Sequence, residues 1–135
     1  MSDPDADAGS SVSLPSVEYL ELYNPTNKNL ELSGLTLQDE TSQTTLNSYL
    51  LLSKQYVLLI QNGNEALYPS TPTLSVSSWP SLNNGGETLA IFNQTNLIFS
   101  LAYSNDWYKD SDKTGGGYSL EMIDVSNPCG DINNW

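Results

Sequence analysis

Residues 85–104, GGETLAIFNQTNLIFSLAYS, decide the fold class that this sequence predicts. Two runs rich in Leu, Ile, Phe and Tyr flank the polar turn Asn93-Gln94-Thr95-Asn96, a pattern typical of a β-hairpin. The second run, residues 97–103, is apolar at nearly every position. Such a run indicates a strand covered on both faces, so we expect it to lie centrally in a β-sandwich.

Shorter segments with apolar residues at every second position predict the other strands. We expect strands at residues 17–23, at 30–37 with a kink at Gly34, at 44–46, at 55–61 and at 118–124. The unbroken apolar centre of residues 55–61 indicates a strand buried on both faces. Residues 65–84 and 105–117 are rich in polar and turn-forming residues, and we expect them to be loops.

The predicted class is an all-β antiparallel sandwich, because no window of helical length keeps apolar residues at positions i, i+3, i+4 and i+7. A chain of 135 residues has the length of one domain. We divide it into an acidic leader or linker at residues 1–15, expected to be disordered, and a sandwich domain at residues 16–135. The side chains expected inside are Leu20, Leu22, Leu37, Val57, Leu59, Leu89, Ile91, Ile98, Leu101, Leu120 and Met122.

The chain is strongly acidic, with 16 Asp and Glu against 4 Lys and Arg and a formal charge of −12 at pH 7. A nucleic-acid-binding protein neutralises phosphates with clustered cations, which this chain lacks. We therefore expect no nucleic acid partner. No segment has the roughly 20 apolar residues needed to cross a bilayer, so we expect no membrane insertion.

The sequence contains no His, which removes the usual general base near neutral pH and the commonest metal ligand. Most hydrolase mechanisms are therefore excluded. We expect no catalytic residue and no cofactor. Cys129 is the single cysteine. It is either a buried thiol or one half of a disulfide whose partner lies outside this sequence.

Four segments carry a family resemblance. They are VEYLELYNPTNKNLELSGLTL at residues 17–37, YLLLSKQYVLLI at 49–60, LNNGGETLAIFNQTNLIFSLAYS at 82–104 and GGGYSLEMIDVSNPCGDINNW at 115–135. In this order they resemble a bacterial lamin-tail domain, the immunoglobulin-like sandwich module named after the tail of nuclear lamins. The resemblance implies an immunoglobulin-like β-sandwich that acts as a binding or scaffolding module and has no catalytic residues of its own.

Bacterial modules of this kind tend to lie in secreted or surface proteins, beside enzymes and adhesion domains. We accordingly expect a non-catalytic interaction or scaffolding module of a larger extracellular or cell-surface protein, with the targeting segment outside this sequence. Its partner would be an unidentified protein or glycan, and we expect the isolated domain to be a monomer. The alternative is an accessory domain of a secreted enzyme that binds carbohydrate or depends on calcium.

One loop is close to the calcium-binding loop template. Asp110, Asp112 and Glu121 stand at its first, third and twelfth positions. Thr114 occupies the fifth position, where Asp or Asn is needed, and Lys113 places a cation among the ligands. We expect a solvated loop without metal, and the three carboxylates are the calcium candidates to examine.

Three aromatic side chains in the loops, Trp79, Trp107 and Tyr108, are candidates for stacking on sugar rings. The alternative is that they anchor the loops to the body of the domain. Asn93-Gln94-Thr95 matches a glycosylation sequon at an exposed turn.

Overall fold

The computed structural model describes residues 4, 15–128 and 132–135. Its strands are β1 Tyr19–Tyr23, β2 Leu30–Glu31, β3 Leu35–Gln38, β4 Gln43–Thr45, β5 Leu50–Leu51, β6 Tyr56–Gln61, β7 Thr73–Val76, β8 Gly86–Asn93 and β9 Asn96–Ser104. Its 3₁₀ helices are η1 Glu65–Leu67, η2 Asn105–Tyr108, η3 Ser111–Lys113 and η4 Ile132–Asn134. In this part of the chain no helix is long and apolar enough to cross a membrane.

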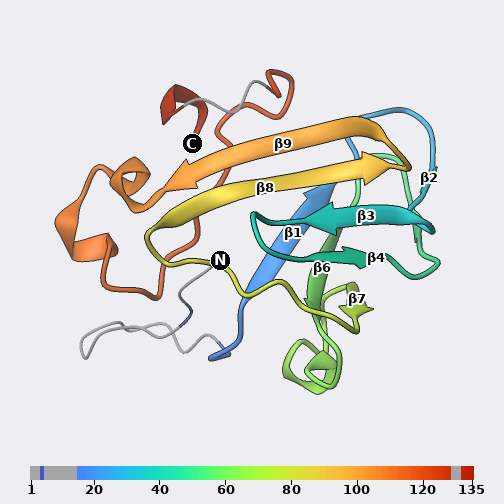
Figure 1. Cartoon of the computed structure of the whole chain (residues 1–135), viewed down its shortest axis with the longest axis horizontal. Helices are drawn as coiled ribbons and strands as arrows, with labels where there is room; N and C mark the ends of the chain where they lie inside the picture. Colours follow the sequence, from blue (N-terminus) through green and yellow to red (C-terminus); the bar gives the residue numbers. More distant parts are fainter. Residues whose placement is uncertain (1–3, 5–14, 129–131) are drawn as a thin grey trace.

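The strands form two packed sheets and one small pair (Figure 1). One sheet has the order β1–β6–β7, the other has the order β4–β3–β8–β9, and β2 pairs with β5. Figure 1 shows β1 and β6 running across the back of the four-stranded sheet, as in a sandwich. The predicted all-β, immunoglobulin-like β-sandwich is confirmed.

The core lies between the two sheets and is centred on β6. The four apolar side chains of β6 are all buried, so the predicted burial of this strand on both faces is confirmed. The core cluster consists of Leu32, Leu37, Leu46, Leu51, Val57, Leu59, Leu74 and Val76. Among the other predicted core residues, Leu89 is buried, Leu20, Leu22 and Ile91 pack against the cluster while partly exposed, and Leu101, Leu120 and Met122 are half-buried.

The predicted hairpin is formed by β8 and β9. Asn93 pairs with Asn96, and Gln94 in the turn has a φ of 55°. At the other end of the hairpin, Gly86 has a φ of 124° and lies against the backbone of β9, where a Cβ would be 2.8 Å from the Cα of Ser104. Glycine is therefore required at the start of β8.

The prediction that residues 97–103 form a central, doubly covered strand is wrong. The central strands of this sheet are β3 and β8, while β9 lies at its edge. Ile98, predicted to be inside, is 59% exposed. A register shift between Ile91 and Phe92 accounts for this, because Phe92 pairs with Leu97 and Ile98 is left as the extra residue of a β-bulge.

Three other expectations differ from the structure. Residues 30–37 form two strands in different sheets, because Gly34, with a φ of 80°, turns the chain between β2 and β3. Residues 65–84 contain β7, which pairs with β6 in parallel and so departs from an entirely antiparallel sandwich.

The predicted closing strand at residues 118–124 is absent from the described strands. The backbone of this segment bonds instead to neighbouring loops and to the C-terminal residues. The Tyr108 hydroxyl donates to the Tyr118 carbonyl at 2.7 Å, and the Ile123 N–H donates to the Asn134 carbonyl at 2.8 Å. Leu120 and Met122 of this segment are thus half-buried although the segment joins no described sheet.

Two expectations fall largely on residues that the structure does not describe. Of the predicted leader, residues 1–3 and 5–14 lie outside the described residues. Cys129 also lies outside them, so its two alternatives stay open.

Candidate interaction surface

The tip of the β8–β9 hairpin exposes apolar side chains. Leu97 and Ile98 are 56% and 59% exposed, although both belong to a strand. The bulge near Phe92 is the local cause, because it turns these residues away from the core. The tip therefore presents hydrophobic surface that the fold does not use.

A second apolar area is held in place by Asn24, a side chain that is fully buried. Its amide nitrogen donates to the carbonyls of Lys28 at 2.7 Å and of Leu51 and Leu52 at 3.1 Å each. Its side-chain oxygen accepts the N–H and the hydroxyl of Thr26, at 3.0 and 2.8 Å. This network joins the turn after β1 to β5, where Leu50 in the strand and Leu52 just after it are exposed.

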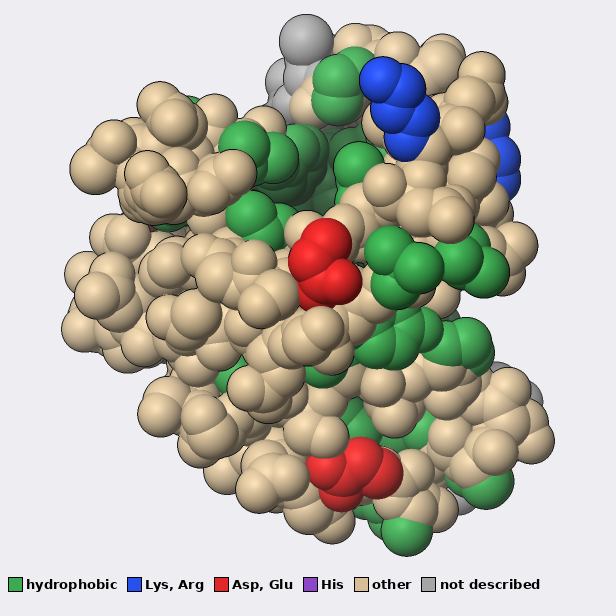
Figure 2. Space-filling view, turned by 90° about the vertical axis from the view of Figure 1, so that its right-hand side faces the viewer, with side chains coloured by type: hydrophobic (Ala, Val, Ile, Leu, Met, Phe, Trp, Pro, Cys, Tyr) green, Lys and Arg blue, Asp and Glu red, His purple; other side chains and the backbone are tan. Residues whose placement is uncertain are grey.

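Strand pairing brings both areas to one end of the sandwich. Asn93, at the hairpin tip, pairs with Leu35. The Leu35 N–H donates to the Leu32 carbonyl at 3.1 Å, and the Leu32 N–H donates to the Tyr49 carbonyl at 3.0 Å, next to Leu50. Figure 2, which faces this side, shows hydrophobic side chains gathered across it. We call this surface the apolar end, and it consists of Leu30, Leu50, Leu52, Leu97 and Ile98.

Lysines lie at the border of the apolar end, and Figure 2 shows acidic side chains on the same side of the molecule. Lys28 and Lys54 lie in the two loops that Asn24 joins, and the Lys54 N–H donates to the Asn24 carbonyl at 3.0 Å. Figure 2 shows lysine side chains at the upper edge of this side. Positive groups therefore border an apolar surface in a chain of net charge −12.

Glu31 is the acidic residue of β2. Its carboxylate accepts the N–H groups of Ser33 and Tyr49, both at 3.0 Å, and the Ser48 hydroxyl at 3.2 Å. These hydrogen bonds, led by that from Ser33, lower the pKa of Glu31. Glu31 thus stays ionised at neutral pH while it ties β2 to the loop before β5.

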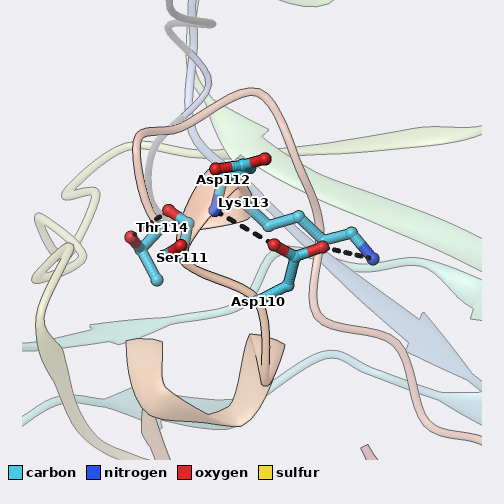
Figure 3. A network of polar contacts seen from close by, with 5 residues as sticks. All are labelled: Asp110, Ser111, Asp112, Lys113 and Thr114. Atoms are coloured by element: carbon cyan, nitrogen blue, oxygen red, sulfur yellow. Dashed lines mark hydrogen bonds and ion pairs between the residues drawn. The ribbon is translucent and has the colours of Figure 1, made fainter.

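The calcium candidates Asp110 and Asp112 lie on either side of the start of η3 (Figure 3). The Asp110 carboxylate accepts the Asp112 N–H at 3.1 Å, as a helix N-cap, and lies 3.8 Å from the Lys113 ammonium. The Thr114 hydroxyl donates to the Ser111 carbonyl at 2.8 Å. The loop is thus organised by contacts within itself.

Glu121, the third calcium candidate, has different neighbours. Its carboxylate accepts the Ser119 hydroxyl at 2.8 Å and faces β1, where its charge helps to raise the pKa values of Tyr19 and Glu21. For both groups burial is the larger cause of the raised pKa. Within the described ranges, no group of three or more Asp, Glu, Cys or His side chains could hold a metal ion.

The three aromatic candidates lie on different elements and contact different partners. Trp79 packs against the core, and its indole N–H donates to the Glu18 carboxylate at 2.7 Å. The Trp107 ring lies 6.2 Å from that of Trp135, and Tyr108 is bonded to the backbone after η3. These contacts fit the alternative in which the rings anchor loops.

Two shallow hollows lie beside β1. One of about 210 Å³ is lined by Ser16, Val17, Glu18, Gln61, Asn64 and Trp79. The other, of about 400 Å³, is bordered by Tyr19, Glu21 and Tyr68. The rings of Tyr19 and Tyr68 pack edge to face, with their centroids 6.1 Å apart. Burial raises the pKa of Tyr68, so both tyrosines stay protonated near neutral pH.

Sequence reasoning did not identify the apolar end. Leu97 and Ile98 belong to a run that the pattern assigns to the core, and no local pattern marks Asn24 as a buried side chain. The run Leu50-Leu51-Leu52 held a usable signal. Side chains of a strand alternate between faces, so when Leu51 is buried in a two-stranded pair, Leu50 and Leu52 point to solvent.

Comparison with known proteins gives one match. Residues 1–105 match the family model described as Lamin Tail Domain. The match includes all nine strands, while η3, η4 and the resemblance noted at residues 115–135 lie outside it. No curated protein and no solved structure matches the chain.

Proposed function

The chain belongs to the lamin tail domain family, and from this premise we propose that it is a non-catalytic module that binds another protein through its apolar end. Members of the family have an immunoglobulin-like fold, usually mediate protein interaction or scaffolding, and are generally non-catalytic. The binding surface and the kind of partner proposed for this chain come from its own residues.

One observation carries the proposal. Five large apolar side chains are exposed together at one end of the sandwich, with exposed fractions from 38% for Leu30 to 59% for Ile98. Single exposed apolar residues are ordinary, whereas a gathered patch marks an interaction site. Burying such a patch against a partner is favourable by about 25 cal/mol for each Å² of apolar surface.

The module acts within a larger bacterial protein that is secreted or held at the cell surface, and as an isolated domain it is a monomer. The charge of −12 supports the monomer, because two copies repel each other at low ionic strength. The same charge supports a protein partner over a nucleic acid.

The test compares the unaltered domain with the variant Leu50→Ser, Leu52→Ser, Ile98→Ser. Each is immobilised and incubated with cell-surface and secreted proteins of the source organism, and retained proteins are quantified by mass spectrometry. We expect a defined partner to be retained at least about tenfold more by the unaltered domain, which corresponds to about 1.4 kcal/mol of binding free energy.

The matched control is Tyr118→Ser, Ile123→Ser, Val125→Ser, which removes exposed apolar side chains away from the apolar end. This control should retain the partner. Circular dichroism must show that both variants keep the fold. Equal retention by all three proteins would refute the apolar end as the binding surface.

A further inference from the structure

We propose that β9 is a docking edge, to which an extended segment of the partner adds as a fifth strand of the β4–β3–β8–β9 sheet. The added strand runs antiparallel to β9 and carries basic residues before apolar ones. This inference rests on the proposed function, because Leu97 and Ile98 of the apolar end belong to β9.

The edge at β9 lacks the usual protection against strand addition. β9 is nine residues long, contains no charged residue and no Pro, and within the described part of the sheet is paired with β8 alone. Soluble proteins usually shield such edges with charges, prolines or very short strands. An unshielded edge offers its free N–H and C=O groups to an incoming strand.

The other outer strands of the two larger sheets, β4, β7 and β1, are protected. β4 has three residues and is polar throughout. At β7, Asn47 donates to the Ser75 carbonyl at 3.1 Å, which occupies an edge acceptor. β1 carries Glu21 in its centre and faces Glu121. The contrast singles out β9.

Residues 96–102 are the stretch available for pairing. Asn96, Leu97, Ile98, Ser100 and Ala102 are all exposed. The bulge at Ile98 twists the strand near the tip, so regular pairing is centred on residues 99–102 and the tip contributes apolar contact.

The chemistry of the added strand follows from the groups at the two ends of β9. Asp106, just beyond the C-terminal end of the strand, is exposed, and its carboxylate makes no ion pair among the described residues. The nearby cations are engaged, Lys113 with Asp110 at 3.8 Å and Lys109 with the Ile132 carbonyl at 2.9 Å. The opposite end of β9 is apolar.

An antiparallel strand places its first residues beside Asp106 and its last residues beside Leu97. Basic residues therefore come first and apolar residues follow. A second copy of the chain is the less favourable occupant, because β9 has no cation to offer and each copy carries a charge of −12.

The test uses the peptide acetyl-Lys-Lys-Thr-Val-Thr-Ile-Thr-amide as the probe, with the reversed sequence as its control. Two further peptides carry N-methyl groups on alternate amides, one on each of the two alternating sets. Binding to the full chain is followed by the amide signals in nuclear magnetic resonance spectra at low ionic strength. Methylation removes hydrogen bonding without changing charge or side chains, so it separates strand addition from nonspecific adhesion.

We expect the probe to shift the amide signals of residues 96–102 and to slow their hydrogen exchange, with no effect at β4. One methylated peptide should bind at least about tenfold more weakly than the probe, while the other stays within about twofold, because alternate amides of a strand face β9. Asp106→Asn should remove the preference for the probe over the reversed peptide.

Several outcomes would overturn the inference. They are equal effects of the two methylations, signal changes confined to another edge, dimerisation of the chain through β9, and no binding of any peptide up to about 1 mM. The peptides could shift the amide signals of Leu50 and Leu52 but not those of β9, or the retention experiment above could succeed while the β9 signals do not change. In either case the proposed function stands and strand addition fails. If retention is unaffected by the apolar-end variant, the proposed function fails by itself.

Discussion

The buried side chain of Asn24 donates a hydrogen bond to the Leu51 carbonyl at 3.1 Å, which ties the turn after β1 to β5. We expect Asn24→Ala to lower the free energy of unfolding by about 2 to 4 kcal/mol, because several buried polar groups lose their partner at once. Urea denaturation measures the change. Asn27→Ala, at an exposed position of the same turn, is the control and should be nearly neutral. Equal effects of the two changes would contradict the role given to Asn24.

Substituting the two isoleucines of the hairpin by Ala should change the free energy of unfolding by very different amounts. Ile91 packs against the core, whereas Ile98 is 59% exposed. Ile91→Ala is therefore expected to cost about 2 kcal/mol or more, and Ile98→Ala less than about 0.5 kcal/mol. The midpoints of urea unfolding give both values. A larger loss at Ile98 would show that the bulge places the strand differently.

Asp39 should make the free energy of unfolding depend on pH in the acidic range. Burial alone would raise the pKa of Asp39, but hydrogen bonds from Thr41 and Ser42 outweigh it and lower the pKa below the ordinary 3.8. A lowered carboxyl pKa stabilises the fold above the unfolded-state pKa, and this stabilisation is lost as the pH falls through the folded-state value. Asp39→Asn should therefore reduce the loss of stability between pH 5 and pH 2, values chosen to span about one to two units either side of the ordinary pKa. The same pH dependence of stability in Asp39→Asn and in the unaltered protein would contradict this role of Asp39.

The ionised carboxylate of Glu21 should lower the stability of the fold, opposite to the effect of Asp39. Burial, followed by the charge of Glu121, raises the pKa of Glu21 above the ordinary 4.5. Its ionised form is thus disfavoured in the folded state, and the resulting destabilisation is present above the folded-state pKa and disappears below the unfolded-state pKa. Glu21→Gln should raise the unfolding midpoint at pH 7 and have little effect near pH 3, about a unit below the ordinary value. Destabilisation at pH 7 would show that the carboxylate has a favourable partner.

Calcium should leave thermal stability nearly unchanged. A site that binds calcium in the folded state alone would add about 2.7 kcal/mol at a hundredfold excess over its Kd. The comparison is millimolar calcium against sodium chloride of equal ionic strength, which controls for screening of the acidic chain. A calcium-specific rise of the melting temperature that Asp112→Asn abolishes would establish a metal site in the loop.

Local patterns predicted some strands well and others poorly. The run of residues 55–61 gave a correct strand, because four consecutive buried apolar residues suit a central position in any sandwich. The hairpin at residues 85–104 was also correct, since its turn and its flanking runs are local features. The predicted burial of β9 was wrong. The same apolar run is compatible with a central strand and with an edge strand that binds a partner, so the pattern alone cannot distinguish them.

Long-range pairing explains the remaining differences. The parallel pairing of β7 with β6 depends on a connection whose path no local pattern specifies. Residues 118–124 alternate like a strand, yet their backbone bonds to Tyr108 and to the C-terminal residues. The apolar end is assembled from loops and strands far apart in the sequence, and could be recognised only after the sheet order was known.

Site-specific photo-crosslinking tests the central claim most directly. A photoreactive phenylalanine analogue is introduced at Leu50, in the apolar end, or at Ile123, which is 71% exposed and lies outside it. Each protein is irradiated in its native setting and its crosslinked products are identified by mass spectrometry. Our account predicts a discrete protein adduct from position 50 and none from position 123. An adduct from position 123 alone, or equal adducts from both, would contradict binding through the apolar end.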